Sequence, residues 1–297
     1  MTAPHATRER TGYAGASDAR ERLLAGLPVV ERRLELAGLP TALLEGGDGP
    51  PVVLLHGPAG NATHWMRVIP ALVGTHRIVA PDLPGHGSSE LADGPPDAAR
   101  VLAWLGELIA HTCPSPPALV GYALGGAIAA RFAATRGDEL DRLVLVDTLG
   151  LVPFQPAPEF GRALEGFLAQ PSARTHDELW RYCAHDLDAL QRRMGDERWD
   201  AFAAYNLDRI AAPGVHAALG ALMGAFGGPP IPADELARIT VPTTLIWGRH
   251  DLATPLTVAE GTSARYGWPL RVIDGSADDP ALEQPEAFAA ALREALR

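Results

Sequence analysis

The sequence predicts an α/β fold, in which a doubly wound and mostly parallel sheet carries helices on both faces. Two observations predict it. Short apolar runs bounded by Gly, Pro or Asp alternate with amphipathic helical patterns, as buried parallel strands and their crossover helices do. The strand pattern then stops between residues 150 and 239, where one helix-like segment follows another. We therefore expect one sheet domain that is interrupted by a helical insertion.

The expected elements follow in chain order. Two early strands with alternating side chains meet at a turn at Gly38. These two strands are expected over 29–36 and 39–45. Six buried strands complete an eight-stranded sheet and are expected over 52–56, 77–80, 118–121, 143–147, 243–247 and 270–273. The helical patterns between and after them cover 64–72, 98–111, 124–135, 255–266 and 285–296.

The strand-free stretch predicts a helical cap. Helix-like segments cover 158–169, 175–186, 199–210 and 215–226, and proline-rich and glycine-rich stretches mark both ends of the insertion. Such an insertion is expected over the carboxyl ends of the strands, where open α/β sheets bind ligands. The resulting division has an N-terminal extension over 1–26, a core over 27–150 and 239–297, and a cap over 151–238.

Composition excludes several kinds of partner. The 297 residues include 25 basic and 36 acidic side chains, a net charge of −11, which argues against nucleic acid and anionic membrane surfaces. Every basic residue is arginine, so lysine chemistry such as a Schiff base is absent. The start of the chain has no signal-peptide pattern and no apolar stretch has transmembrane length, so we expect a cytoplasmic protein.

Cofactor and metal chemistry have no sequence signal either. Cys113 and Cys183 do not make a disulfide framework, and no Cys/His metal spacing or phosphate-binding glycine loop occurs. We therefore expect no cofactor and no metal.

Four motifs, in order and at the expected spacing, resemble those of the α/β-hydrolase superfamily. Residues 54–57 followed by His64 and Trp65 resemble the strand and loop that supply half of the oxyanion hole. Residues 80–89 resemble the family's structural signature, 121–126 its nucleophile elbow, and 247–251 the strand end that bears the triad acid. The resemblance extends from about residue 29 to the C-terminus. It implies a capped member of the epoxide-hydrolase and C–C-hydrolase type.

Three departures from the family pattern concern the catalytic groups themselves. Ala123 occupies the position of the nucleophilic serine. Asp278 aligns with the family's general-base histidine, because the Pro, Glu and Pro that follow that histidine match here without gaps. Pro58 stands where the family has an N–H donor to the oxyanion, and proline has no N–H. Asp251 alone remains of the triad, so we do not expect ester hydrolysis by a triad.

The remaining groups suggest acid–base chemistry. Two carboxylates, Asp251 and Asp278, would share a small desolvated site, where one pKa should rise and give a proton donor beside an acceptor. The N–H of Leu124 would hold an oxyanion or enolate oxygen. Two alternatives stay open: Asp278 can be a solvated turn residue, and Asp251 can be a structural carboxylate that caps the helix near Pro255.

The same positions define an expected substrate pocket. Ala123 leaves an apolar floor, which suits a small apolar or polycyclic molecule and forbids a covalent acyl intermediate. His250 is also a candidate replacement for the lost base. The expected binding residues are Pro58, Ala59, Tyr122, Ala123, Thr148, Phe154, Tyr182 and His250.

These features favour a non-hydrolytic, cofactor-independent enzyme on a hydrolase scaffold. Its reaction would be cyclisation, elimination, isomerisation or C–C bond formation in natural-product, polyketide-like biosynthesis, an inference from the resemblance. Two alternatives remain: a catalytically dead small-molecule-binding protein of the same fold, and a hydrolase inactivated by Ser-to-Ala engineering. The oligomeric state has no signal in the sequence.

Overall fold

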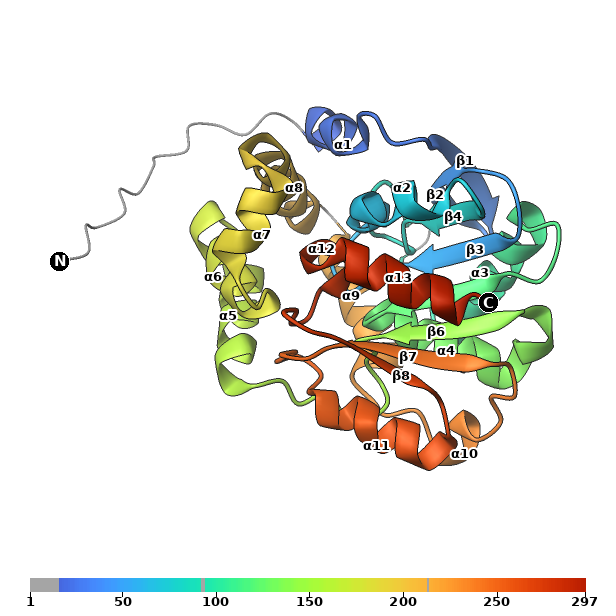
Figure 1. Cartoon of the computed structure of the whole chain (residues 1–297). Coiled ribbons are helices and arrows are strands. Elements are labelled where there is room, and N and C mark those ends of the chain that lie inside the picture. The colour runs from blue at the N-terminus through green and yellow to red at the C-terminus, as the bar shows by residue number, and fades with distance from the viewer. Residues whose placement is uncertain (1–15, 92–93, 213) are drawn as a thin grey trace.

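A computed structural model describes residues 16–91, 94–212 and 214–297, and the predicted eight-stranded, mostly parallel sheet is confirmed in it (Figure 1). The strand order is β1-β2-β4-β3-β5-β6-β7-β8. β1 and β2 are antiparallel to each other, β2 is antiparallel to β4, and all other neighbours are parallel. The strands are β1 (Val30–Leu36), β2 (Leu39–Gly46), β3 (Pro51–Leu55), β4 (Arg77–Pro81), β5 (Ala118–Tyr122), β6 (Arg142–Val146), β7 (Thr243–Gly248) and β8 (Leu270–Ile273).

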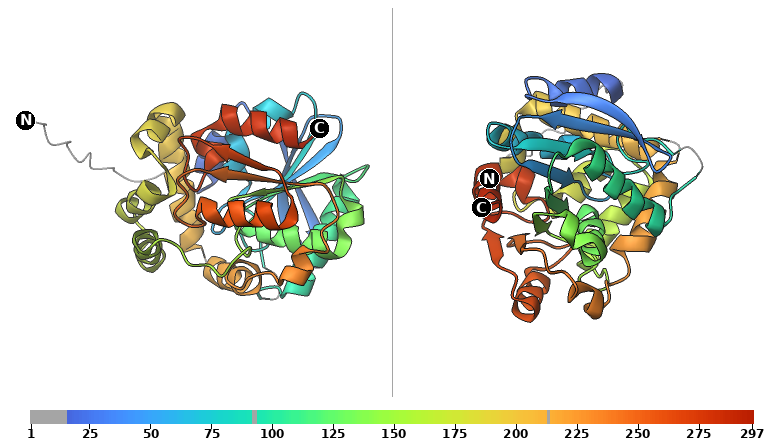
Figure 2. Two further views of the ribbon diagram at one scale, coloured as in Figure 1. Left: turned by 60° about the horizontal axis from the view of Figure 1, so that its bottom comes forward. Right: turned by 90° about the vertical axis from the view of Figure 1, so that its right-hand side faces the viewer.

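Helices cover both faces of the sheet (Figure 2). α3 (Ala98–Thr112), α4 (Leu124–Arg136) and α10 (Ala233–Leu236) pack together on one face. On the other face, α2 (Ile69–Leu72) packs on α13 (Pro285–Ala295). The helix predicted over 64–72 is divided into a 3-10 helix, η1 (Ala62–Arg67), and α2. The Asn61 side-chain oxygen caps η1 by accepting the Thr63 N–H, and Pro70 opens a new first turn.

Helices α5 to α9 lie between β6 and β7 in the chain, and Figure 1 shows α5 to α8 gathered beyond one end of the sheet. Their bounds are α5 (Pro158–Ala169), α6 (Ala173–Cys183), α7 (Leu187–Met194), α8 (Asp196–Ala211) and α9 (Val215–Leu222), which a π-helical turn, η3 (Met223–Gly227), follows. The segment predicted as one helix over 175–186 ends earlier, because Asp186 accepts a hydrogen bond from the Ala189 N–H (2.8 Å) and starts α7. These helices build an apolar cluster that is separate from the sheet core.

Helix α1 (Ala16–Leu24) links the two apolar clusters near the start of the described chain. Its buried Arg20 lies 3.1 Å from Asp82 in the loop after β4 and donates to the Tyr205 hydroxyl on α8 at 2.9 Å. The same side chain pairs with Glu31 on β1 at 2.8 Å. One guanidinium therefore holds a sheet loop, a strand and a helix of the insertion together.

In the described part of the chain, no single helix is long and apolar enough to cross a membrane. α8 and residues 215–227 meet that criterion only as a pair, which is bent by 87°.

Candidate active site

The sharp turn between β5 and α4 keeps the elbow geometry without a nucleophile. Ala123 has φ 47° and ψ −108°, a backbone conformation that is strained for any residue other than glycine. Two glycines make the turn possible. A Cβ on Gly121 would lie 2.4 Å from the Gly125 carbonyl oxygen, and one on Gly125 would lie 2.6 Å from the His56 carbonyl oxygen. The turn therefore presents the Ala123 methyl group where an elbow would present its nucleophile.

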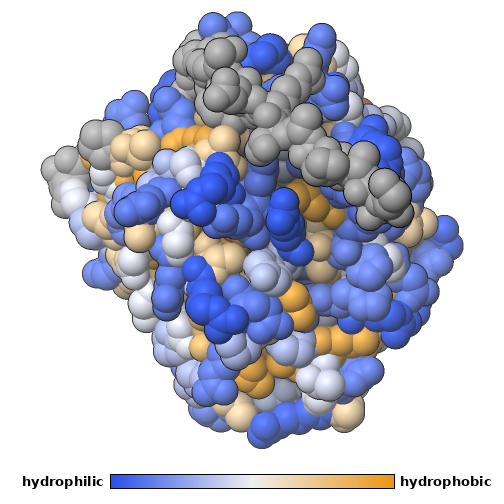
Figure 3. Space-filling model, turned by 90° about the vertical axis from the view of Figure 1, so that its left-hand side faces the viewer, coloured by the Kyte–Doolittle hydropathy of each residue, from blue (hydrophilic) through white to orange (hydrophobic). Residues whose placement is uncertain are grey.

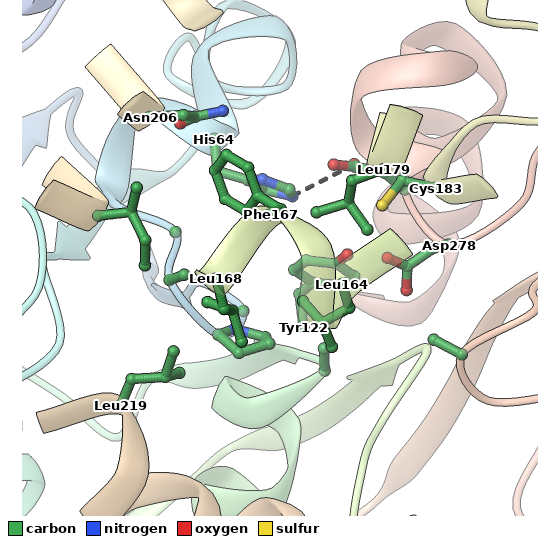
Figure 4. Close-up of a pocket in the computed structure, with 18 of the residues that line it drawn as sticks. His64, Tyr122, Leu164, Phe167, Leu168, Leu179, Cys183, Asn206, Leu219 and Asp278 are labelled. Atoms are coloured by element: carbon green, nitrogen blue, oxygen red, sulfur yellow. Dashed lines mark ion pairs between the residues drawn. The ribbon is translucent and has the colours of Figure 1, made fainter. Parts of the chain in front are cut away.

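A cavity of about 420 Å³ lies between this turn and the inserted helices. Ala123 and Asp147 line it from the carboxyl ends of β5 and β6. Figure 4 shows Leu164, Phe167 and Leu179 of the insertion close to Tyr122 and His64. The apolar part of the wall consists of Leu149, Phe154, Phe160, Leu164, Phe167, Leu168, Leu179, Trp180, Phe202, Ile210, Leu219 and Met223. An apolar enclosure of this size suits a small organic molecule.

One part of the cavity wall is polar, and His64 is at its centre. The His64 Nε2 atom lies 3.2 Å from Asp279 Oδ1, and the imidazole stacks on the Tyr122 ring at 4.6 Å between centroids (Figure 4). Asp279 also accepts the Leu282 N–H at 3.1 Å, which fixes its carboxylate at the start of α12 (Pro280–Glu283). Because the Asp279 carboxylate is at Nε2, the other ring nitrogen, Nδ1, faces away from it. A histidine that acts as a general base has this arrangement.

Asp278, beside this pair, is a carboxyl group that resists ionisation. Burial raises its pKa well above the ordinary value, and the charges of Asp251 and Asp279 raise it further, whereas a hydrogen bond from the Tyr122 hydroxyl opposes the rise. Burial and the Asp251 charge also raise the pKa of Asp147, another cavity residue, well above its ordinary range. A carboxyl group that keeps its proton at neutral pH can donate a hydrogen bond or a proton.

The loop that carries Asp278 and Asp279 is held by the buried Glu283. Its carboxyl accepts the Ala277 N–H at 2.7 Å and the Ser276 hydroxyl at 3.0 Å, and it reaches the His185 N–H at 2.6 Å after α6. Burial raises the pKa of Glu283 to about 7. The Asp278 N–H also donates to a carbonyl oxygen of the inserted helices, that of Cys183, at 3.1 Å. The loop is therefore joined directly to the helices above the cavity.

Asp251 does not line the cavity, although its charge acts on Asp278. Its Oδ1 accepts the N–H groups of Ala253 (2.7 Å) and Thr254 (2.9 Å), and its Oδ2 accepts the Thr254 hydroxyl at 2.5 Å. Burial raises its pKa to about 6, while these hydrogen bonds act to lower it. Such contacts are those of a structural carboxylate, which was one of the two interpretations open from the sequence; a part in catalysis stays a prediction.

Five of the eight expected binding residues line the cavity, namely Pro58, Ala59, Tyr122, Ala123 and Phe154. The Leu124 N–H belongs to the first turn of α4, where N–H groups have no intrahelical acceptor, directly after Ala123.

The structure places the other three expected binding residues outside the cavity wall. Thr148 is turned toward α4 and donates to the Val146 carbonyl oxygen at 3.3 Å. Tyr182 lies on the wrong side of α6, whose cavity face is formed by residues 176, 179, 180 and 183, the i, i+3, i+4, i+7 pattern. His250 lies in the turn after β7, where it is exposed and stacks on His185 with ring centroids 4.1 Å apart.

Four of the polar cavity residues that sequence reasoning missed lie in two close pairs. His64 and Asp279 stood in recognised motifs, but their pairing depends on a contact between distant segments. His176 on α6 and Asn206 on α8 lie 3.3 Å apart, between His176 Nε2 and Asn206 Nδ2. In the described ranges, no group of three His, Cys, Asp or Glu side chains could hold a metal ion.

The chain belongs to the alpha/beta hydrolase family, whose model matches residues 52–291. It is 28% identical over 247 residues to the pimeloyl-[acyl-carrier protein] methyl ester esterase of Aeromonas hydrophila subsp. hydrophila, covering 82% of this chain and 93% of the relative. It is 26% identical to the 2-hydroxy-6-oxo-6-(2'-aminophenyl)hexa-2,4-dienoic acid hydrolase of Metapseudomonas resinovorans over 77% of this chain and 78% of the relative.

A solved structure shows the same relationship. The 2-hydroxy-6-oxo-6-phenylhexa-2,4-dienoate hydrolase from Rhodococcus sp. strain RHA1 superimposes with a TM-score of 0.78 at 25% identity, covering 91% of this chain and 99% of that chain. The resemblance read from the motifs is thus confirmed, and the named relatives are enzymes.

The same comparisons correct the predicted reaction. These relatives are named as an esterase and as hydrolases, so the prediction of a non-hydrolytic enzyme for cyclisation or C–C bond formation in natural-product biosynthesis is wrong. That prediction equated the loss of serine and of the late histidine with the loss of hydrolysis. It did not consider that a histidine from another segment, His64, reaches the same cavity.

Proposed function

We propose that this protein hydrolyses a small apolar ester or related carbonyl compound by direct attack of water, without an acyl-enzyme. The observation that carries the proposal is the pair of His64 and Asp279 in the wall of the cavity that Ala123 also lines, with Nε2 and Oδ1 3.2 Å apart. The hydrolytic names of the relatives support the reaction class.

His64 is the proposed general base. With Asp279 on Nε2, the Nδ1 atom accepts a proton from water, and the carboxylate stabilises the imidazolium that forms. Because Ala123 has only a methyl group, the water oxygen itself bonds to the carbonyl carbon. The Tyr122 ring, stacked on the imidazole, fixes its plane.

Asp278 is the proposed acid. Its raised pKa keeps a proton on the carboxyl, which passes to the leaving oxygen as the ester bond breaks. The proton that His64 has taken from water returns to Asp278 and restores both groups. The Leu124 N–H is the proposed donor to the oxyanion from the elbow side, and Pro58 supplies no second N–H.

A ligand-binding role without turnover is the second candidate, and the methyl group of Ala123 is the observation that favours it. The elbow is intact although it presents no nucleophile, and the wall of the cavity above it is largely apolar. A protein of this kind would retain its ligand and release it chemically unchanged.

Stopped-flow hydrolysis of p-nitrophenyl butyrate separates the two candidates. Hydrolysis by water predicts release of p-nitrophenol above the buffer rate, linear from the first turnover, with no burst stoichiometric with enzyme. A burst would contradict direct attack by water. If the ester binds saturably but is hydrolysed no faster than in buffer, hydrolysis by the protein is rejected and the ligand-binding role is supported.

A further inference from the structure

The charged groups in the cavity wall are unfavourable for binding a carboxylate. Three carboxyl groups, Asp147, Asp278 and Asp279, line it, and no arginine is found among the described residues of its wall. The whole chain contains no lysine. Arg67 is near Asp279, but its guanidinium donates to the Leu282 carbonyl oxygen at 2.6 Å and is not part of the wall.

The other basic groups of the described wall are histidines. His64 already lies against Asp279, with Nε2 and Oδ1 3.2 Å apart. His176 is beside the Asn206 amide, within rings of Phe167, Trp180, Trp199 and Phe202. His216 is the third histidine of the wall, at the side of α9. An anion that enters therefore meets carboxyl groups and apolar surface, and no arginine side chain among the described wall residues pairs with it.

The behaviour of Asp278 shows what such surroundings do to a carboxylate. Burial and the neighbouring carboxylates raise its pKa well above the ordinary value. A ligand carboxylate in the same cavity would experience the same two effects. It would enter only as the neutral acid, which is a small fraction of the molecules at neutral pH.

We propose that the cavity selects uncharged carbonyl compounds and rejects free carboxylates, so that ester hydrolysis converts a retained substrate into an expelled acid. The selection among ligands is independent of turnover, whereas its role in product release rests on the proposed function. Two of the similar proteins are named as hydrolases of a dienoic acid and of a dienoate, and the described wall of the present cavity has no arginine or lysine to pair with such a carboxylate.

The size of the effect follows from the ionisation of the ligand. A carboxylic acid with a pKa of about 4.3 is roughly one part in 1,000 neutral at pH 7.3. If only the neutral form binds, its apparent affinity is about 1,000-fold below that of an uncharged isostere of equal apolar area.

Isothermal titration calorimetry of the full-length protein at pH 7.3 tests the selection with three ligands of one chain length: 5-phenylpentan-2-one, 4-phenylbutanoic acid and 4-phenylbutylamine. We expect the ketone to bind at least 100-fold more tightly than the acid and no less tightly than the amine. Equal binding of ketone and acid, or no binding of the ketone, would overturn the inference. Tighter binding of the amine would overturn it too, in favour of a site for cations.

Two variants show whether the carboxyl groups cause the rejection. Asp278→Asn combined with Asp279→Asn should raise the affinity for the acid, relative to that for the ketone, at least tenfold. The control Asp138→Asn removes a carboxyl group at an exposed position outside the cavity wall and should leave the ratio of the two affinities unchanged. A ratio that stays unchanged in the double variant would contradict the electrostatic cause. None of these titrations depends on turnover, so hydrolysis is judged separately by its rate.

Discussion

Ionisation of Glu283 is expected to lower the free energy of unfolding as the pH rises toward neutrality. Burial raises its pKa from about 4.5 in the unfolded chain to about 7 in the fold. Below pH 4.5 both states hold the proton, and above pH 7 both have lost it, so stability changes only between these limits. In that window the unfolded chain ionises first, and ionisation therefore favours unfolding. About 2.5 pH units at roughly 1.4 kcal/mol each amount to a loss of about 3 to 4 kcal/mol.

Glu283→Gln isolates this contribution. The amide oxygen can still accept the Ala277 N–H and the Ser276 hydroxyl, but the amide nitrogen faces the His185 N–H, so a constant destabilisation is expected. Urea unfolding at intervals from pH 4.5 to 7.5 gives the free energy of unfolding of both proteins. The advantage of the wild type should shrink by about 3 to 4 kcal/mol across the window. If the free energy of unfolding has the same pH dependence in both proteins, Glu283 does not have a raised pKa in the folded state and does not hold its proton there.

Three further substitutions test the elbow and its surroundings. Asp251→Ala removes the acceptor of three buried hydrogen bonds and should lower the free energy of unfolding in urea by about 3 kcal/mol or more; an unchanged unfolding midpoint would contradict the structural role. Gly125→Ala should destabilise strongly, because its Cβ would lie 2.6 Å from the His56 carbonyl oxygen, whereas the control Gly166→Ala meets open space on a helix and should be neutral or stabilising in the same titration. Ala123→Ser should form no acyl-enzyme with p-nitrophenyl butyrate, and a mass increase of one butyryl group in intact-protein mass spectrometry would contradict this.

The strands were predictable because buried parallel strands leave a local signal. Each is a short apolar run that ends at a turn residue, and that signal does not depend on distant segments. Helix boundaries were harder to predict from the sequence. The division between α6 and α7 depends on whether Asp186 caps a new helix, and the division between η1 and α2 depends on Pro70, both of which are choices of local geometry.

The site was predictable only where a motif fixes both spacing and orientation. Ala123 and Tyr122 belong to a strained turn, so their place at the cavity follows from the turn itself. Thr148 and His250 were misplaced because each lies two residues beyond a strand, in a loop or turn whose direction the sequence does not fix. The His64–Asp279 pair was missed because η1 and the loop before α12 come together only through tertiary packing. Hydrolysis was dismissed on the changes at Ala123, Asp278 and Pro58, without the knowledge that another histidine lines the same cavity.

The most direct test of the proposed hydrolysis is the rate of His64→Gln measured against that of His250→Gln. His250 is an exposed histidine outside the cavity wall, so its substitution should leave kcat/KM for p-nitrophenyl butyrate unchanged. His64→Gln should lower kcat by roughly 100- to 10,000-fold, the usual contribution of a general base, while the affinity for 5-phenylpentan-2-one stays within a few-fold. A wild-type rate in His64→Gln, or an equal loss in both variants, would contradict the assignment of His64 as the base.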